Sequence, residues 1–359
     1  MNPLSTTYSG SVASIDLANL KKNLEYLRQK SRTDDVMAVV KANAYGHGAV
    51  QVSRYLETYI REFAVATVDE GIQLRKGGIE KPILVFGLPR QDTSEAYVKH
   101  DLTATICHPD QFRLLSAGTG YQVNIDTGMR RAGLDPLQTA AVRTEMENHR
   151  DLTCRGIYSH YATADDPGSR LVREQHNRFL QVRSGFPVDI PAHMSNTAAV
   201  LHYDLDHLDM IRVGIGLAGY APGRIQSDKL RPVLSWETRA CLVRKISRGD
   251  VVSYGAGWKA PADGYLATLP VGYADGIPRR LTNRLKVKAG KRMVPVAGSI
   301  TMDFCMVFLG DQPVEPGTPV QLLGPDGCWR ADRWAAEAET VTHEILCRLT
   351  SRIHRRYSH

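Results

Sequence analysis

The chain has 359 residues, of which 43% are hydrophobic and 23% charged, a composition typical of a globular protein rather than a disordered or fibrous one. The length excludes a single small core and favours two domains, or a large barrel with an appendage. The formal net charge of +7 is spread along the chain without a base-stacking motif, so we expect no nucleic-acid partner.

The cysteines and the first residues bear on the compartment. The six cysteines are far apart and include no CxxC pair, which predicts neither a disulfide framework nor a metal site (107, 154, 241, 305, 328 and 347). The N-terminus, MNPLSTTYSGSVASIDL, has neither a basic region nor a continuous apolar stretch, so no secretory signal and no membrane association are expected. These features favour a cytoplasmic protein.

The first two thirds of the chain alternate short apolar runs with helical patterns. Segments such as 48–60 and 173–186 have apolar residues at helical spacing and can cover a barrel from outside. The apolar runs predict eight strands, at 36–42, 63–68, 82–87, 103–107, 121–126, 153–160, 189–195 and 210–217. Eight such units predict a (β/α)8 barrel with its chemistry at the C-terminal ends of the strands.

After about residue 230 the pattern changes to closely spaced strand-like runs separated by Gly, Pro and Asp. They lie at 251–255, 265–273, 284–289, 292–298, 304–310 and 319–324. A final helical pattern covers 331–339 and 342–357. Its basic residues Arg348, Arg352, Arg355 and Arg356 fit a solvated helix face as well as an anionic partner.

The sequence therefore predicts an α/β fold: a TIM-type barrel over residues 10–230, followed by a separate, mostly-β domain over 231–359. Residues 1–9 are expected to pack on the second domain.

Lys41 ends an apolar run and is followed by ANAYGHG, where glycines and an asparagine break the strand. A lysine at the top of a barrel strand can hold a carbonyl cofactor as a Schiff base, or can simply cap the strand at the surface.

The whole string VVKANAYGHG closely resembles the cofactor-lysine motif of alanine racemases. The resemblance continues in order along nearly the whole chain, through IDTGM (125–129), GIYSHYATAD (156–165), SNTAA (195–199), RVGIGLAGYAP (212–222), VSYGAGW (252–258), GYADGIPRR (272–280) and TMDFCM (301–306). It implies a pyridoxal 5'-phosphate (PLP) enzyme that interconverts L- and D-alanine.

The resemblance implies a catalytic role for Lys41, Tyr254, His160 and Arg212. Lys41 would carry the cofactor and act as one base, and Tyr254 of the partner subunit in a homodimer would be the second proton carrier. Two bases on opposite faces are what racemisation requires. His160 would bond to Tyr254 and to Arg212, and Arg212 would face the pyridine nitrogen and leave it unprotonated.

The resemblance also implies the binding residues. The phosphate would be held by Tyr45, Thr197 and the backbone N–H groups of Gly214 and Ile215, with Asn196 beside them. Arg131 would reach the cofactor's phenolic oxygen and the substrate carboxylate, and Met302 and Asp303 would complete the substrate site. The access channel would be lined by Asp165, Tyr273, Arg279 and Asp303.

Three positions depart from the family pattern. Asn124 stands where a carbamylated lysine usually pairs with the equivalent of Arg131, so we expect either a small anion such as chloride beside Arg131, or direct donation from Asn124 to the neighbours of Arg131. Ser299 replaces an arginine of many relatives, which would widen the access channel or weaken carboxylate steering. Ser351 stands where some relatives have tyrosine and others serine.

These departures keep alternatives open. A serine racemase or broad-specificity racemase fits the same scaffold. A decarboxylase of the same cofactor class would need a site that labilises the carboxylate, whereas Arg131 with Met302 resembles a clamp. Single-domain barrels that bind the cofactor without clear turnover lack the domain that carries Tyr254. The biological role would be D-alanine supply for peptidoglycan, or the catabolic reverse.

Overall fold

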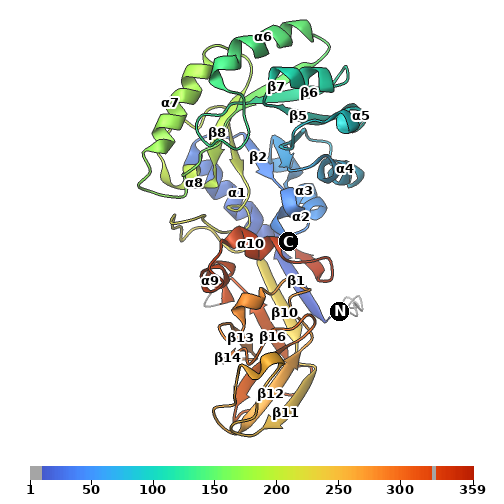
Figure 1. Cartoon of the computed structure of the whole chain (residues 1–359), viewed down its shortest axis with the longest axis vertical. Helices are drawn as coiled ribbons and strands as arrows, with labels where there is room; N and C mark the ends of the chain where they lie inside the picture. The colour runs from blue at the N-terminus through green and yellow to red at the C-terminus, as the bar shows by residue number, and fades with distance from the viewer. Residues whose placement is uncertain (1–9, 326–328) are drawn as a thin grey trace. The chain divides into compact units, whose positions relative to one another are not determined.

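The computed structural model describes residues 10–325 and 329–359, which form two compact units (Figure 1). One unit spans Lys21–Leu230, and the other combines residues up to Leu20 with Arg231–His359. The barrel unit thus begins later than the residue 10 expected from the sequence, because strand β1 (Ser11–Asp16) pairs with strands of the second unit. The predicted packing of residues 1–9 lies outside the described residues.

The barrel unit contains a closed, eight-stranded parallel barrel, as predicted. Most residues of its strands are buried, because both faces of a parallel barrel strand are covered. They are β2 (Val36–Val39), β3 (Glu62–Val65), β4 (Ile83–Val85), β5 (Leu102–Ile106), β6 (Gly120–Asn124), β7 (Thr153–Tyr158), β8 (Ala192–Asn196) and β9 (Met210–Val213).

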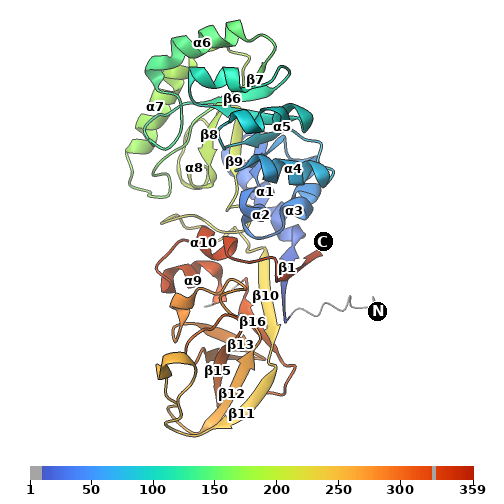
Figure 2. The same cartoon turned by 45° about the vertical axis from the view of Figure 1, so that its right-hand side comes forward.

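Helices surround these strands (Figure 2). On α7 the buried residues Val172, Gln175, His176 and Phe179 recur at helical spacing, so this helix turns one stripe of side chains inward. The helices are α1 (Leu17–Ser31), α2 (Lys41–Tyr45), α3 (Ala49–Leu56), α4 (Val68–Lys76), α5 (Ser94–Lys99), α6 (Thr139–Asn148), α7 (Leu171–Arg183) and α8 (Thr197–His202), with 3₁₀ turns at Glu57–Tyr59, Gln91–Thr93, Pro109–Leu114 and Pro136–Gln138. No described helix is long and apolar enough to cross a membrane.

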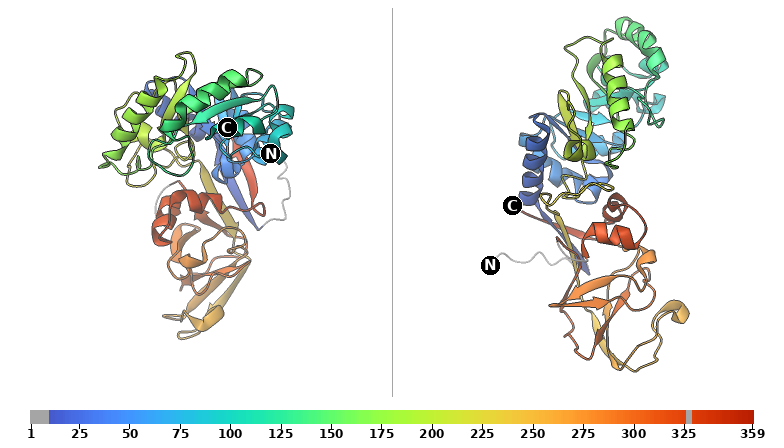
Figure 3. Two further views of the ribbon diagram at one scale, coloured as in Figure 1. Left: turned by 45° about the horizontal axis from the view of Figure 1, so that its top comes forward. Right: turned by 90° about the vertical axis from the view of Figure 1, so that its left-hand side faces the viewer.

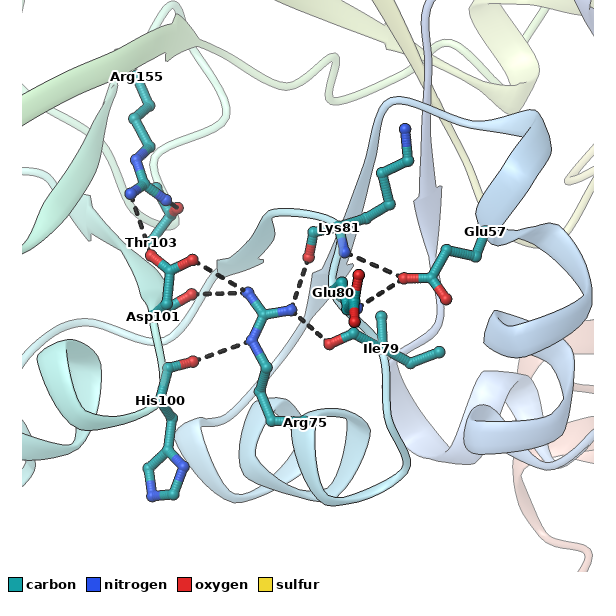
Figure 4. Close-up of polar contacts among 9 residues, drawn as sticks. All are labelled: Glu57, Arg75, Ile79, Glu80, Lys81, His100, Asp101, Thr103 and Arg155. Carbon is teal, nitrogen blue, oxygen red and sulfur yellow. Dashed lines mark hydrogen bonds and ion pairs between the residues drawn. The ribbon is translucent and has the colours of Figure 1, made fainter.

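Arg75 of α4 ties together the segments that lead into the barrel strands (Figure 4). Its guanidinium donates to the carbonyls of Ile79 and Lys81, which precede β4, and to those of His100 and Asp101, which precede β5, at 2.7 to 3.0 Å. The cluster lies at the N-terminal ends of the strands, the face of a barrel that serves stability rather than chemistry.

Replacing Arg75 with methionine is expected to destabilise the protein by about 2–4 kcal/mol, because carbonyls that now accept from a charged group lose their donor. The midpoint of urea unfolding would fall, while activity per folded molecule stays unchanged. Equal midpoints for Arg75→Met and the unmodified chain would show that the cluster does not support the barrel.

The second unit contains two sheets. The larger has the strand order β14-β13-β16-β10-β1-β17 and the smaller the order β11-β12-β15. The strands are β10 (Leu234–Arg239), β11 (Leu242–Ile246), β12 (Gly264–Leu269), β13 (Lys286–Ala289), β14 (Arg292–Pro295), β15 (Cys305–Gly310), β16 (Pro319–Leu323) and β17 (His354–Ser358), with 3₁₀ turns at Tyr254–Ala256 and Arg279–Leu281.

Helices α9 (Ala331–Glu337) and α10 (Thr342–Cys347), red in Figure 3, lie beside this larger sheet. Trp334 of α9 packs on Trp236 of β10, with ring centroids 6.1 Å apart, and both indoles are buried. Burying two large aromatic rings against each other stabilises the packing of α9 on this sheet.

Two sequence predictions for this unit are wrong. Residues 251–255 form no strand; Val251 makes an isolated bridge to Lys259 and a 3₁₀ turn follows. The predicted helix to residue 357 ends at Cys347, and His354–Ser358 pairs in parallel with β1, a partner more than 300 residues away that no local pattern reveals.

Candidate functional site

Lys41 lies directly beyond β2 on a strained turn. The next four residues, Ala42, Asn43, Ala44 and Tyr45, have φ between 50° and 54°, the left-handed region that costs a residue with a side chain about 1–2 kcal/mol each. The Lys41 Nζ lies 5.7 Å from the ring centroid of Phe86, which follows β4.

Hydrogen bonds from neighbouring segments hold this turn. The Glu70 carboxylate accepts from the backbone N–H groups of Ala42 at 2.6 Å and Ala66 at 2.7 Å, and the Asn43 Oδ1 accepts from Ala49 N–H at 2.8 Å. The turn that carries Lys41 is therefore fixed from two sides. Sequence reasoning missed Glu70 and Phe86, although TVDE is a recognisable capping box and Phe86 lies near the end of the strand predicted at 82–87.

Arg212 on β9 is buried, and its terminal nitrogens are fully used. NH1 donates to Nδ1 and the carbonyl of His193, at 2.8 and 3.1 Å. NH2 donates to the Ser159 carbonyl at 2.7 Å, to His160 Nδ1 at 3.1 Å and to the Met194 carbonyl at 3.3 Å. A guanidinium has five N–H groups, so only the Nε–H is left without an acceptor among the described residues.

His160, just beyond β7, is held in one tautomer. Because a guanidinium only donates, His160 Nδ1 must accept from Arg212, and the ring proton sits on Nε2. Burial, together with the nearby charges of Arg212, Arg131 and Lys41, lowers the pKa of His160 to about 3. His160 is therefore neutral at physiological pH and presents an Nε2–H donor.

Tyr45, Thr197, Gly214 and Gly216 form a small cradle of donors. A Cβ at Gly214 would overlap the hydroxyl of Tyr45, and one at Gly216 would overlap the side chain of Thr197. The backbone N–H groups of Gly214 and Ile215 donate to no acceptor among the described residues. Hydroxyls and unpaired N–H groups around glycines suit a bound anion such as phosphate.

Asn196 borders the cradle as the N-cap of α8. Its Oδ1 accepts from Ala199 N–H at 3.0 Å, which fixes the start of that helix at Thr197.

Asn124, at the end of β6, uses its amide locally. Its Nδ2 donates to the Ala132 carbonyl at 3.2 Å and to the Cys107 Sγ at 3.8 Å. The bond to Ala132, which adjoins Arg131, is the arrangement expected if Asn124 binds the neighbours of Arg131 directly. Arg131 itself is exposed and has no hydrogen bond or ion pair to a described residue.

These residues all follow the C-terminal ends of barrel strands. The loops after β2, β6, β7, β8 and β9 supply Lys41, Arg131, His160, Thr197 and Gly214 in turn. In a parallel barrel these loops meet at one end, which is where such folds place their chemistry. The structure thus brings the barrel residues predicted from the sequence to one end of the barrel.

Tyr254 belongs to the second unit and is 76% exposed. It sits in a tight turn in which Ser253, Gly255 and Ala256 have positive φ. Ser299 secures this turn, since its hydroxyl donates to the Tyr254 carbonyl at 2.9 Å while its own carbonyl accepts from the Ser253 hydroxyl at 2.8 Å. Ser299 therefore positions the Tyr254 backbone, a role that its sequence did not suggest.

Met302 and Asp303 lie in another loop of the second unit. Arg352 pairs with Asp303 at 2.9 Å and with Asp275 at 3.3 Å, which joins this loop to the 272–276 turn. The Met302 carbonyl accepts from Ala274 N–H at 3.1 Å, and Met302 is half exposed. Arg352, which sequence analysis placed only in a basic tail, is thus a support of this loop. Tyr273, Arg279 and Asp165, which were expected from the sequence to line an access channel, are exposed, the last in the barrel unit.

The comparisons with known proteins cover nearly the whole chain. Residues 15–222 match the alanine racemase N-terminal domain and residues 233–357 the alanine racemase C-terminal domain. The alanine racemase of Symbiobacterium thermophilum is 36% identical over 96% of both chains.

Solved structures agree with this assignment. An alanine racemase from D-cycloserine-producing Streptomyces lavendulae has a TM-score of 0.91 and 29% identity over 98% of both chains. A histidine racemase from Leuconostoc mesenteroides subsp. sake has a TM-score of 0.92 and 26% identity over 99% of both chains. The chain therefore belongs to the alanine racemase family, and it is an isomerase.

Proposed function

We propose that this protein interconverts L- and D-alanine with PLP as its cofactor and with Lys41 and Tyr254 as the two proton carriers. The observation that carries the proposal is the anion cradle of Tyr45, Thr197, Gly214 and Gly216 at the same barrel end as Lys41, in a chain that matches both domains of the family.

The residues at the barrel mouth fit PLP. Tyr45, Thr197 and the N–H groups of Gly214 and Ile215 would bind the phosphate beside Asn196, Lys41 would hold the carbonyl, and the Arg212 Nε–H would face the pyridine nitrogen. When bound, PLP withdraws electrons from the substrate and makes its α-proton acidic. Because Arg212 keeps its own proton, it would limit that withdrawal and suppress side reactions such as transamination.

Replacing Gly214 with alanine is expected to weaken PLP binding about 10- to 100-fold, because the added methyl overlaps the Tyr45 hydroxyl and overpacking of this kind costs about 1–3 kcal/mol. The dissociation constant of PLP, measured by its absorbance after dialysis, tests this. Gly168→Ala is a matched control, because a Cβ there meets only the end of Asp166 at 3.8 Å. Similar PLP affinities for the two variants would place the phosphate elsewhere.

The two-base reaction assigns separate tasks to protein groups. The Lys41 amine would remove or return the α-proton on one face, and the Tyr254 hydroxyl would act on the other. The neutral His160 offers its Nε2–H to the Tyr254 oxygen, which would stabilise the phenolate form that a free tyrosine, with a pKa of about 10, does not reach at neutral pH. Tyr254 would come from the partner subunit of a homodimer with two composite sites.

Substrate binding would involve Arg131, Met302 and Asp303. Arg131 would reach the phenolic oxygen and the substrate carboxylate, and the Met302 N–H would also bind that carboxylate. The ion pair of Asp303 with Arg352 supports this assignment, because it would hold the Met302 loop in place.

A small anion such as chloride beside Arg131 is a further part of the proposal. It is supported by the exposed Arg131 guanidinium without a described partner and by the Asn124 amide, which is neutral. Exchanging chloride for a large inert anion at constant ionic strength is expected to lower kcat/KM for alanine severalfold. The Arg131 guanidinium would then lose the attraction of the chloride ion that holds it in place. Unchanged rate and KM would remove the anion from the site.

A broad-specificity or serine racemase is the second candidate. The similarity to a solved histidine racemase structure favours it, as does Ser299, a small residue at the position where many relatives have an arginine. Incubation of the holoenzyme in heavy water with L-alanine, L-serine, L-lysine, L-arginine or L-histidine separates the candidates through loss of the α-proton signal and the final chirality. Inversion of alanine far above the others supports an alanine racemase, comparable turnover of several supports broad specificity, and no exchange with any would overturn the proposed function.

The biological role that we propose is supply of D-alanine for peptidoglycan. Because racemisation has an equilibrium constant near one, the enzyme can equally run in the catabolic direction. The described cysteines are free thiols, which fits a reducing compartment such as the cytoplasm; Cys328 lies outside the described residues.

A further inference from the structure

A chain of polar side chains runs from Arg212 through the inside of the barrel. Arg212 NH1 donates to His193 Nδ1 at 2.8 Å, His193 Nε2 bonds to Gln122 Oε1 at 2.8 Å, and Gln122 Nε2 donates to Glu62 Oε2 at 3.1 Å. The four residues come from β9, β8, β6 and β3. Since β6 is adjacent neither to β8 nor to β3, the chain crosses the interior of the barrel.

All four residues are buried. Glu62 is 8% exposed, Gln122 1%, His193 0% and Arg212 4%. Barrel interiors are ordinarily filled by branched aliphatic side chains, and burying polar groups costs several kcal/mol unless every donor and acceptor is paired. A continuous hydrogen-bonded set of polar side chains in this place therefore serves something other than packing, and it ends at Arg212.

The chain has one direction. The guanidinium at one end can only donate, so His193 Nδ1 accepts and its ring proton must sit on Nε2. The Nε2–H donates to the Gln122 amide oxygen, and this hydrogen bond leaves the Gln122 NH₂ facing Glu62. The carboxylate at the far end accepts, so each group has only one orientation and one tautomer open to it.

The surroundings of His193 and Arg212 favour the same state. The Tyr158 ring stacks on His193 with centroids 5.3 Å apart and an interplanar angle of 6°, and the Arg212 guanidinium lies 5.2 Å over the same ring. Burial lowers the pKa of His193 well below its usual value, which keeps the imidazole neutral. Burial raises the pKa of Glu62, and Arg61, with its Nε 3.8 Å from Glu62 Oε1, opposes that rise.

We propose that Glu62, Gln122 and His193 are positioning residues for Arg212: they hold its guanidinium in the one orientation that leaves Nε–H free to face the barrel mouth. The contact between the Nε–H and the pyridine nitrogen of PLP rests on the proposed function. The control of the His193 tautomer and the Arg212 orientation by these three residues does not.

The test compares Gln122→Leu, which removes the acceptor for His193, with Glu62→Gln, which keeps an oxygen acceptor at the far end and has the same shape. The full-length protein, labelled with ¹⁵N-histidine, reports the His193 ring nitrogens by NMR, with His193→Gln to assign the signals. The PLP dissociation constant, kcat/KM for alanine and thermal unfolding are measured on the same samples.

In the unmodified protein we expect His193 protonated on Nε2 alone. Gln122→Leu should shift the His193 nitrogen signals, weaken PLP binding about tenfold and lower kcat/KM about 10- to 100-fold, as loss of an orienting hydrogen bond does at metal sites. Glu62→Gln should keep the His193 tautomer, because an oxygen acceptor remains at this position. Its PLP affinity should stay within about threefold of that of the unmodified protein.

A merely structural role would lower the unfolding temperature of Gln122→Leu and leave the His193 signals and the PLP affinity unchanged, and that result would overturn the inference. So would a His193 protonated on Nδ1 in the unmodified protein. If the signals and PLP affinity change as expected while no amino acid is racemised by the unmodified protein, the proposed function fails and the positioning chain stands.

Discussion

Replacing Lys41 with alanine is expected to abolish racemisation, with a fall in kcat of at least about 10⁴-fold. The side chain has two tasks in the proposed reaction, attachment of the cofactor and proton transfer on one face of the substrate. General acid–base catalysis by one group alone contributes about 10²- to 10⁴-fold. The purified variant should also lose the long-wavelength absorbance of lysine-bound PLP.

The fold should survive this change, because the turn after Lys41 is held through backbone groups of Ala42 and Ala49 and not through the lysine side chain. Lys99→Ala, an exposed lysine at the end of α5, is the matched control and should keep full activity. Lys41→Ala protein that unfolds at the normal temperature and racemises alanine at more than about one hundredth of the normal rate would exclude Lys41 as the attachment site.

Replacing Tyr254 with phenylalanine is expected to lower racemisation about 10²- to 10⁴-fold while PLP binding persists. The change removes only the hydroxyl of a side chain that is 76% exposed, so unfolding should be unaffected. With one proton carrier left, one enantiomer of alanine should still exchange its α-proton in heavy water, but without inversion. Exchange with normal inversion would show that another group is the second carrier.

Mixing the two variants tests whether each site combines residues of two subunits. A dimer of one Lys41→Ala and one Tyr254→Phe subunit has one site with both changes and one with neither. After subunit exchange, random pairing makes half of the dimers mixed, so about a quarter of the normal activity should return in a symmetric dimer with two sites. No recovery, with exchange verified by a size tag, would place Lys41 and Tyr254 of each site on the same chain.

The barrel could be predicted because its signal is local. The β-branched runs from Val36 to Val213 recur between helical patterns, and the structure confirms all eight strands. Lys41 stands out for a related reason, since it ends an apolar run and the C-terminal ends of parallel strands meet. The resemblance to the family, and not the strand pattern, pointed to His160 and Gly214.

The second unit was harder because its pairing is not local. β1 joins β10 and β17, so strands from both ends of the sequence share one sheet, whereas the sequence pattern of the last strand predicts a helix. The 251–255 run reads as a strand, yet positive φ at Ser253 and Gly255 turns the chain there.

The sequence by itself determined the family and the barrel, and it supplied the residues proposed here to carry the chemistry, because motifs and apolar periodicity are properties of short segments. Only the tertiary structure decided which nitrogen of His160 and His193 carries the proton, which N–H of Arg212 stays free, and that Gln122 and Glu62 bear on it. Those properties depend on which donors and acceptors meet across the barrel, and residues as far apart as 62 and 212 meet only once the strands have closed.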